Sequence, residues 1–276
     1  MSDIRDLLDF HEPYFTFCRE ERNYAALLYH VLLLPGNLQK FLKHLQTEGA
    51  VSDTWPTETA NAELYVEYAF LRDMWQRARP DPKTAVYTIA TLVPGFPLER
   101  LSNDPVKFNS DLVSGVNPSD KHIQNPGRWS IAKIDDLCGP YETEVFRRTC
   151  MFKWSFNIKP DLAVQLSPEH IVILETKYDS GEAKYPTKPE EQAIFSRRGC
   201  ERVGQMELQG FLLREILGMQ ATQLLVRKKP LPASSPHSPP PYLTTTWASI
   251  LGSMDLSHAH PFAQEMIQTR LMTGTH

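Results

Sequence analysis

One short apolar run limits the folds open to this chain more than any other feature. Ile171-Val172-Ile173-Leu174 is continuous, and three of its four residues are β-branched. Such a run is typical of a strand that is covered on both faces of a sheet. It is followed at once by Glu175, Thr176 and Lys177. The sequence therefore predicts a buried strand with charged side chains at its end, in an α/β fold with helices packed on the sheet.

Helical and extended patterns alternate along the rest of the chain. The expected elements are helices over 19–34, 38–45, 60–79, 200–217 and 261–271, strands over 151–158, 161–166, 171–174 and 224–227, and a last strand or strand–helix junction over 244–251. We expect one domain over residues 1–276. Within it, 80–136 is predicted to be an irregular insertion with one or two short elements, and 230–242 a Pro-rich loop.

Composition excludes several classes of protein. The chain has 276 residues, 41% of them hydrophobic, which is enough for a sizeable core. Its net charge of −4 argues against a uniformly basic binder but leaves a local basic groove open. The four cysteines include no CxxC pair, so no thiolate zinc site is expected. There is no signal-peptide pattern, and no apolar stretch reaches the roughly 18 residues of a membrane span. We therefore expect a cytoplasmic protein without a membrane partner.

Two carboxylates and an ammonium group are expected to meet at the end of the central strand. Pro160-Asp161 is separated from Glu175-Thr176-Lys177 by thirteen residues. Glu175 and Lys177 are two apart on a strand, so their side chains point to the same face. A hairpin through Ser167-Pro168 would bring Asp161 beside them. Charged groups in such a place are costly unless they bind something.

These groups suit hydrolysis of a phosphodiester with the help of a divalent metal. Mg²⁺ (or Mn²⁺) prefers oxygen ligands, which Asp161, Glu175 and the backbone carbonyl of Thr176 could supply. The metal would acidify or orient a water molecule, and Lys177 would hold that water or stabilise the developing charge. The structural alternative is that Asp161 forms a turn after Pro160 and that Glu175 and Lys177 lie where the strand enters solvent.

This pattern resembles the PD-(D/E)xK nuclease superfamily, which includes many restriction endonucleases, Holliday-junction resolvases and RecB-type nuclease domains. Those enzymes usually carry a glutamate on a helix ahead of the sheet, and Glu20 or Glu21 stands in that place. Many RecB-like members also carry a glutamine on the helix after the lysine strand, as Gln205 does here. The alternatives are a carboxylate favoured by the helix dipole for Glu20 or Glu21, and a solvated helix residue for Gln205.

The resemblance implies a restriction-endonuclease-like core, a central mixed sheet flanked by helices, with a long insertion after the N-terminal helices. It implies a Mg²⁺-dependent nuclease, with DNA favoured over RNA as the substrate, in DNA repair, a mobile element or phage defence; a homodimer is left open. The alternative is a non-catalytic nucleic-acid-binding or assembly module that retains the fold. The basic residues that could contact phosphates are Arg197, Arg198, Arg202, Arg227 and Lys228, and ordinary surface charge is the alternative for each of them.

Overall fold

The chain divides into two compact units, each with its own hydrophobic core. The computed structural model describes residues 13–55, 59–78, 81–93, 95–102, 104–115, 121–139, 142–230 and 242–273. The first unit comprises Met1–Tyr68, Pro160–Gly181 and Met219–His276, and the second comprises Ala69–Lys159 and Glu182–Gly218. The second unit is thus inserted at two points of the first. The prediction of one domain over residues 1–276 did not include this division.

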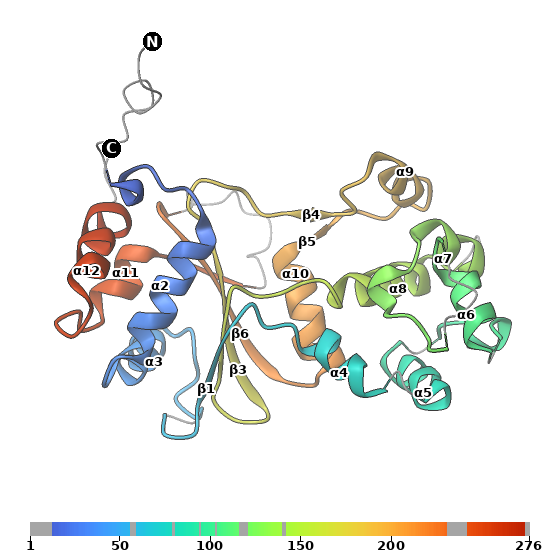
Figure 1. The fold of residues 1–276 in the computed structure, drawn as a ribbon, viewed down its shortest axis with the longest axis horizontal. Helices are drawn as coiled ribbons and strands as arrows, with labels where there is room; N and C mark the ends of the chain where they lie inside the picture. Colours follow the sequence, from blue (N-terminus) through green and yellow to red (C-terminus); the bar gives the residue numbers. More distant parts are fainter. Residues whose placement is uncertain are drawn as a thin grey trace, which may run out of the picture. The chain divides into compact units, whose positions relative to one another are not determined.

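The first unit contains the sheet (Figure 1). Its strands are β1 (Glu63–Val66), β2 (Leu162–Gln165), β3 (His170–Thr176), β6 (Gln220–Arg227) and β7 (Leu243–Thr246). Its helices are α2 (Glu21–Leu33), α3 (Asn37–Thr47), α11 (Trp247–Gly252) and α12 (Pro261–Met266), with a 3₁₀ turn over Tyr14–Thr16 and a π-helical turn over Ile267–Met272. Strand β7 runs directly into α11, which confirms the predicted strand–helix junction.

The sheet is mixed, with the strand order β1-β2-β3-β6-β7. Strands β1, β2 and β3 are antiparallel neighbours, whereas β3, β6 and β7 are parallel. The hairpin between β2 and β3 sets Leu162 opposite Leu174, so Asp161 lies beside Glu175, as the sequence predicted. An α/β fold with a mixed central sheet flanked by helices is therefore confirmed.

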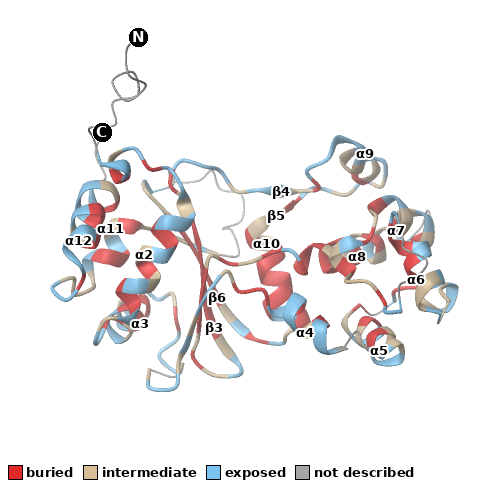
Figure 2. Ribbon diagram, in the orientation of Figure 1, coloured by how far each residue is buried: buried red, intermediate tan, exposed pale blue. Residues whose placement is uncertain are grey.

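Alternation along the strands builds the core of the first unit. Val164, Val172 and Leu224 point to one face, where they pack with Tyr24 and Leu28 of α2. Burying each such side chain contributes about 1.5–3 kcal/mol. Figure 2 shows β3 and β6 as buried, whereas α2 alternates between buried and exposed residues. This packing fixes the start of α2 relative to the end of β3.

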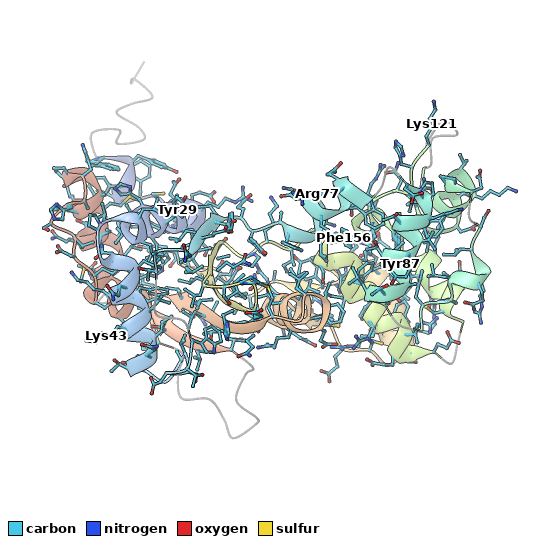
Figure 3. All side chains as sticks on the ribbon, turned by 90° about the horizontal axis from the view of Figure 1, so that it is seen from below. Tyr29, Lys43, Arg77, Tyr87, Lys121 and Phe156 are labelled. Atoms are coloured by element: carbon cyan, nitrogen blue, oxygen red, sulfur yellow. The ribbon has the colours of Figure 1, made fainter. Side chains whose placement is uncertain are left out.

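The second unit is mainly helical. Its elements are α4 (Phe70–Ala78), α5 (Pro82–Leu92), α6 (Pro105–Leu112), α7 (Ile131–Cys138), α8 (Thr143–Ser155), β4 (Lys184–Tyr185), α9 (Pro189–Arg197), β5 (Val203–Gly204) and α10 (Gln205–Gly210), with 3₁₀ turns over Leu98–Arg100 and Pro126–Arg128 and a π-helical turn over Phe211–Ile216. Aromatic side chains such as Trp75, Phe152 and Phe156 form its core. Tyr87 and Lys121 are exposed on its surface (Figure 3).

Two predicted elements were wrong. Residues 151–158 lie mostly within α8 rather than in a strand, because Phe146, Cys150 and Trp154 recur at helical spacing and are buried together. The expected helix over 60–79 is divided: Glu63–Val66 pairs with β2 as the edge strand, and α4 begins only at Phe70. Tyr and Val favour strands, and pairing with β2 places Tyr65 and Val66 in a strand and not in a helix.

The segment 80–136 is more regular than predicted, because its Asp-Pro pairs begin helices. Asp81 accepts a hydrogen bond from Thr84 N at 3.1 Å, and Asp104 accepts one from Lys107 N at 3.0 Å. In both helices a proline follows the capping aspartate, which is a favoured arrangement at a helix start. Residues 231–241 of the predicted Pro-rich loop 230–242 lie outside the described residues. Within the described ranges, no helix combines the length and apolar content needed to cross a membrane.

Candidate functional site

The candidate site lies at the carboxyl ends of three parallel strands. Thr176 of β3 is opposite Val226 of β6, and Thr246 of β7 is opposite Arg227. The three strands therefore end at the same edge of the sheet. In open α/β sheets, this edge is where ligands are generally bound. Glu175 and Lys177 are placed there by the end of β3.

Asp161 is tied directly to the end of β3. Its Oδ2 atom accepts hydrogen bonds from Thr176 N at 2.8 Å and from Thr176 Oγ1 at 2.6 Å. Its backbone carbonyl accepts from Glu67 N at 3.0 Å, which continues the pairing of β1 with β2. The structure thus brings the aspartate of the sequence motif to the strand that carries the glutamate and the lysine.

The ammonium group of Lys177 is surrounded by carboxylates. Its Nζ atom donates to Glu175 Oε1 at 2.7 Å and lies 3.7 Å from Glu21 Oε2. The side chains of Lys177, Glu175 and Glu21 are 12%, 2% and 21% exposed. Burial alone would lower the pKa of Lys177, but the charge and hydrogen bond of Glu175 raise it above its ordinary value. The charges of Glu21 and Asp161 act in the same direction, so Lys177 is a cation at neutral pH.

Of the two glutamates proposed from the first helix, Glu21 reaches the strand end. Its Oε1 atom accepts hydrogen bonds from Tyr178 N at 2.8 Å and from Ser180 Oγ at 2.7 Å. Burial would raise the pKa of Glu21, but these hydrogen bonds and the charge of Lys177 outweigh it and lower the pKa. Glu20 is the residue before α2, and its side chain is exposed.

Four of the proposed residues belong to the second unit. Gln205 opens α10, and its N–H donates to Ala183 O at 2.9 Å. Arg197 and Arg198 both pair with Asp135 of α7. Arg202 donates to the backbone carbonyl of Lys184 at 2.6 Å.

The two remaining basic candidates end β6 in the first unit. Arg227 is its last residue, and Lys228 follows. Lys228 Nζ donates to Tyr178 Oη at 2.9 Å and lies 4.5 Å from the centroid of that ring. A half-buried cation is thus held against Tyr178, the residue that follows Lys177, by the end of the next strand of the sheet.

The sequence analysis missed three residues that contact this group. Tyr178 directly follows Lys177, so its position next to the motif could have identified it as a residue near the site. Trp247 donates its indole N–H to Lys177 O at 3.2 Å, and the Arg270 guanidinium lies 5.1 Å from the Tyr178 ring. Trp247 and Arg270 come from the C-terminal segment, far along the chain, and no local pattern marks them.

The donor atoms of the site match those that a hard divalent cation prefers. Asp161, Glu175 and Glu21 offer carboxylate oxygens, and Thr176 adds a backbone carbonyl. In the conformation described, Lys177 interacts with Glu175 and Glu21, and Thr176 holds Asp161. Across the described ranges, no group of three or more His, Cys, Asp or Glu side chains is arranged to hold a metal ion.

Comparisons with known proteins gave no match. No protein-family model, no curated protein and no solved structure matches it. We therefore infer the function from the geometry of the site and from the resemblance of its motif.

Proposed function

We propose that this protein is a metal-dependent nuclease of the PD-(D/E)xK type that hydrolyses phosphodiester bonds in nucleic acid, with DNA as the favoured substrate. The observation that carries the proposal is the surplus of carboxylates around Lys177. Glu175 and Glu21 flank its ammonium, and the charge of Asp161 also acts on it.

The charge balance favours a cation site over a purely structural ion pair. A structural pair needs one carboxylate for one ammonium, whereas here the charges of three carboxylates act on one. A partly buried surplus of negative charge is destabilising unless a further cation offsets it. A divalent ion that takes oxygen ligands supplies that charge.

Each residue has a distinct role in the proposed reaction. Asp161 and Glu175, with the Thr176 carbonyl, would hold Mg²⁺ or Mn²⁺, which supplies an activated water and offsets charge on the phosphate. Lys177 is cationic, so it would position the attacking water and stabilise the negative charge that develops on the phosphate oxygens. Glu21 holds the Lys177 ammonium from the helix side.

Cleavage of supercoiled plasmid and of single-stranded DNA, in the presence of Mg²⁺ or Mn²⁺, tests the proposal. Wild-type protein should nick DNA, and addition of EDTA should stop the reaction. Asp161→Ala and Lys177→Ala should each lower the rate by about 100-fold or more, the scale of removing a stabilising group from a transition state. Lys43→Ala is the control, because Lys43 is an exposed residue of α3 in the same unit (Figure 3).

The rival proposal is a nucleic-acid-binding module that has kept the site residues without turnover. The pairing of Lys177 with Glu175 and Glu21 favours it, because in this arrangement the carboxylates already have a cation. DNA binding by the wild type without metal-dependent cleavage would support the rival. Cleavage that survives in both Asp161→Ala and Lys177→Ala would place the activity elsewhere.

A further inference from the structure

The C-terminal segment reaches the candidate site through one buried tryptophan. Strand β7 lies parallel to β6, with Thr246 opposite Arg227, so the next residue, Trp247, lies at the same sheet edge as Lys177. The Trp247 side chain is fully buried. Its indole N–H donates to the backbone carbonyl of Lys177 at 3.2 Å.

Trp247 and Glu21 hold opposite edges of a single peptide group. The peptide between Lys177 and Tyr178 presents its C=O to the Trp247 indole and its N–H to Glu21 Oε1, at 2.8 Å in the second case. Because a peptide group is planar and rigid, fixing both edges fixes its orientation. The Lys177 N–H is held as well, by Val226 O at 2.8 Å. The backbone on both sides of the Lys177 side chain is therefore fixed.

The side chain of Tyr178, the residue after this peptide bond, is itself packed against neighbouring side chains. Its ring stacks on that of Tyr24, with a centroid distance of 4.8 Å. Arg270, also from the C-terminal segment, lies 5.1 Å from the Tyr178 ring and donates to Cys18 O at 3.1 Å. The C-terminal segment thus contacts both residues that flank the peptide bond.

We propose that Trp247 is a positioning residue for the Lys177 ammonium and the Glu21 carboxylate. Its indole N–H fixes the plane of the peptide group that follows Lys177. The Tyr178 N–H of that peptide group in turn holds the Glu21 carboxylate, which lies beside the Lys177 ammonium. The effect on catalysis rests on the proposed nuclease function. The effect on the backbone does not.

Trp247→Phe tests this role, because it removes the N–H and keeps an aromatic ring. Trp75→Phe is a matched control: Trp75 is also buried, but its indole N–H has no hydrogen-bond partner in the described part of the chain. In the DNA-cleavage assay we expect kcat to fall roughly 10- to 100-fold in Trp247→Phe, with KM changed by less than about threefold, since small displacements at a site act on the chemical step. In Trp75→Phe we expect both constants to stay within about twofold.

Amide hydrogen exchange gives a second readout that does not need turnover. A peptide covering residues 176–180 should exchange about tenfold faster in Trp247→Phe than in the wild type, because its amides lose part of their protection. The same peptide should be unchanged in Trp75→Phe. If the wild type cleaves no DNA, this measurement still decides the positioning role, so failure of the proposed function and failure of this inference are distinguishable.

A third variant separates the hydrogen bond from packing. Trp247→His keeps a ring N–H donor but loses apolar contact area, so it should protect residues 176–180 better than Trp247→Phe even if it lowers the melting temperature more. If Trp247→Phe does not fold, exchange in Trp247→His near the wild-type rate supports the role. The role would be overturned if Trp247→Phe and Trp75→Phe showed equal exchange and equal kcat. It would also be overturned if residues 176–180 exchanged as fast in Trp247→His as in Trp247→Phe.

Discussion

Each unit contains a charged cluster, and the two clusters have opposite imbalances. In the first unit, three carboxylates act on the single ammonium of Lys177. In the second unit, two guanidinium groups, those of Arg197 and Arg198, share the carboxylate of Asp135. The difference shows that a charged cluster must be interpreted by its net charge and by what else surrounds it, because the sequence analysis proposed functional roles in both.

The cluster of the second unit is held in place by contacts beyond the two ion pairs. Asp136 lines the same cavity of about 480 Å³ as Asp135 and the two arginines. Arg198 also donates to the Asp135 backbone carbonyl at 2.7 Å and lies 4.5 Å from the Phe146 ring. These contacts join α7 to α8 and α9, so we interpret the pairing of Asp135 with Arg198 as a structural ion pair. In the first unit, by contrast, the charges of three carboxylates act on one ammonium.

The largest effect on stability is expected from Asp135→Asn. The Arg198 side chain is 7% exposed, and the substitution leaves its charge buried without a carboxylate. We expect the free energy of unfolding to fall by about 3–5 kcal/mol, the usual cost of breaking a buried pair. Urea denaturation measures it. Asp136→Asn is the control on the same helix, and because Asp136 is exposed it should change stability by about 0.5 kcal/mol or less. Equal losses in the two variants would contradict the structural role of Asp135.

A smaller, pH-dependent effect is expected from Glu21→Gln. The pKa of Glu21 is lowered in the folded chain, so the native carboxylate adds stability above its unfolded pKa of about 4.3, and this stability is lost as the pH falls through the folded pKa. The variant should be less stable than the wild type by about 1 kcal/mol at pH 7, and the difference should shrink in acid.

Unfolding curves from pH 7 to pH 3 check this prediction. Glu20→Gln is the matched control, because Glu20 is the preceding residue and its side chain is exposed. Its effect should stay within about 0.5 kcal/mol at every pH. A difference for Glu21→Gln that is constant with pH would show that the carboxylate charge is not what stabilises the chain there.

The smallest effect is expected from Glu175→Gln, although Glu175 is the most buried charged residue of the site. Lys177 keeps Glu21 at 3.7 Å, and removing one charge relieves repulsion among the carboxylates. Without divalent cations the loss should therefore be below about 1 kcal/mol, in contrast to a buried pair that is simply broken. Urea denaturation beside Asp135→Asn measures the contrast. A loss as large as that of Asp135→Asn would mean that the first cluster is also a structural pair.

The parts of the fold set by neighbouring residues could be predicted from the sequence. The apolar run at 171–174 and the turn at Ser167-Pro168 predict the hairpin, and the hairpin predicts that Asp161 lies close to Glu175. The Asp-Pro pairs at 81 and 104 are also local signals, but such pairs occur in loops as well as at helix starts, so they do not predict the helices by themselves.

Other features depend on contacts between distant parts of the chain. Residues 151–158 form an apolar and aromatic run that fits a strand or a buried helix equally well, and only the packing of Phe146, Cys150 and Trp154 together decides for the helix. Trp247 contacts Lys177 because β7 pairs with β6, and no short sequence pattern predicts that pairing. The choice of Glu21 over Glu20 likewise depends on how α2 packs against β3.

The binding of Mn²⁺, followed by electron paramagnetic resonance, tests whether the carboxylates around Lys177 form a divalent-cation site. We expect one ion bound for each wild-type chain, with binding lost in Asp161→Asn and Glu175→Gln and kept in Glu20→Gln. Mn²⁺ is suited to this test because it takes the same oxygen ligands as Mg²⁺. Binding that is absent in the wild type, or that is equal in all four proteins, would contradict the claim that the carboxylates around Lys177 form a divalent-cation site.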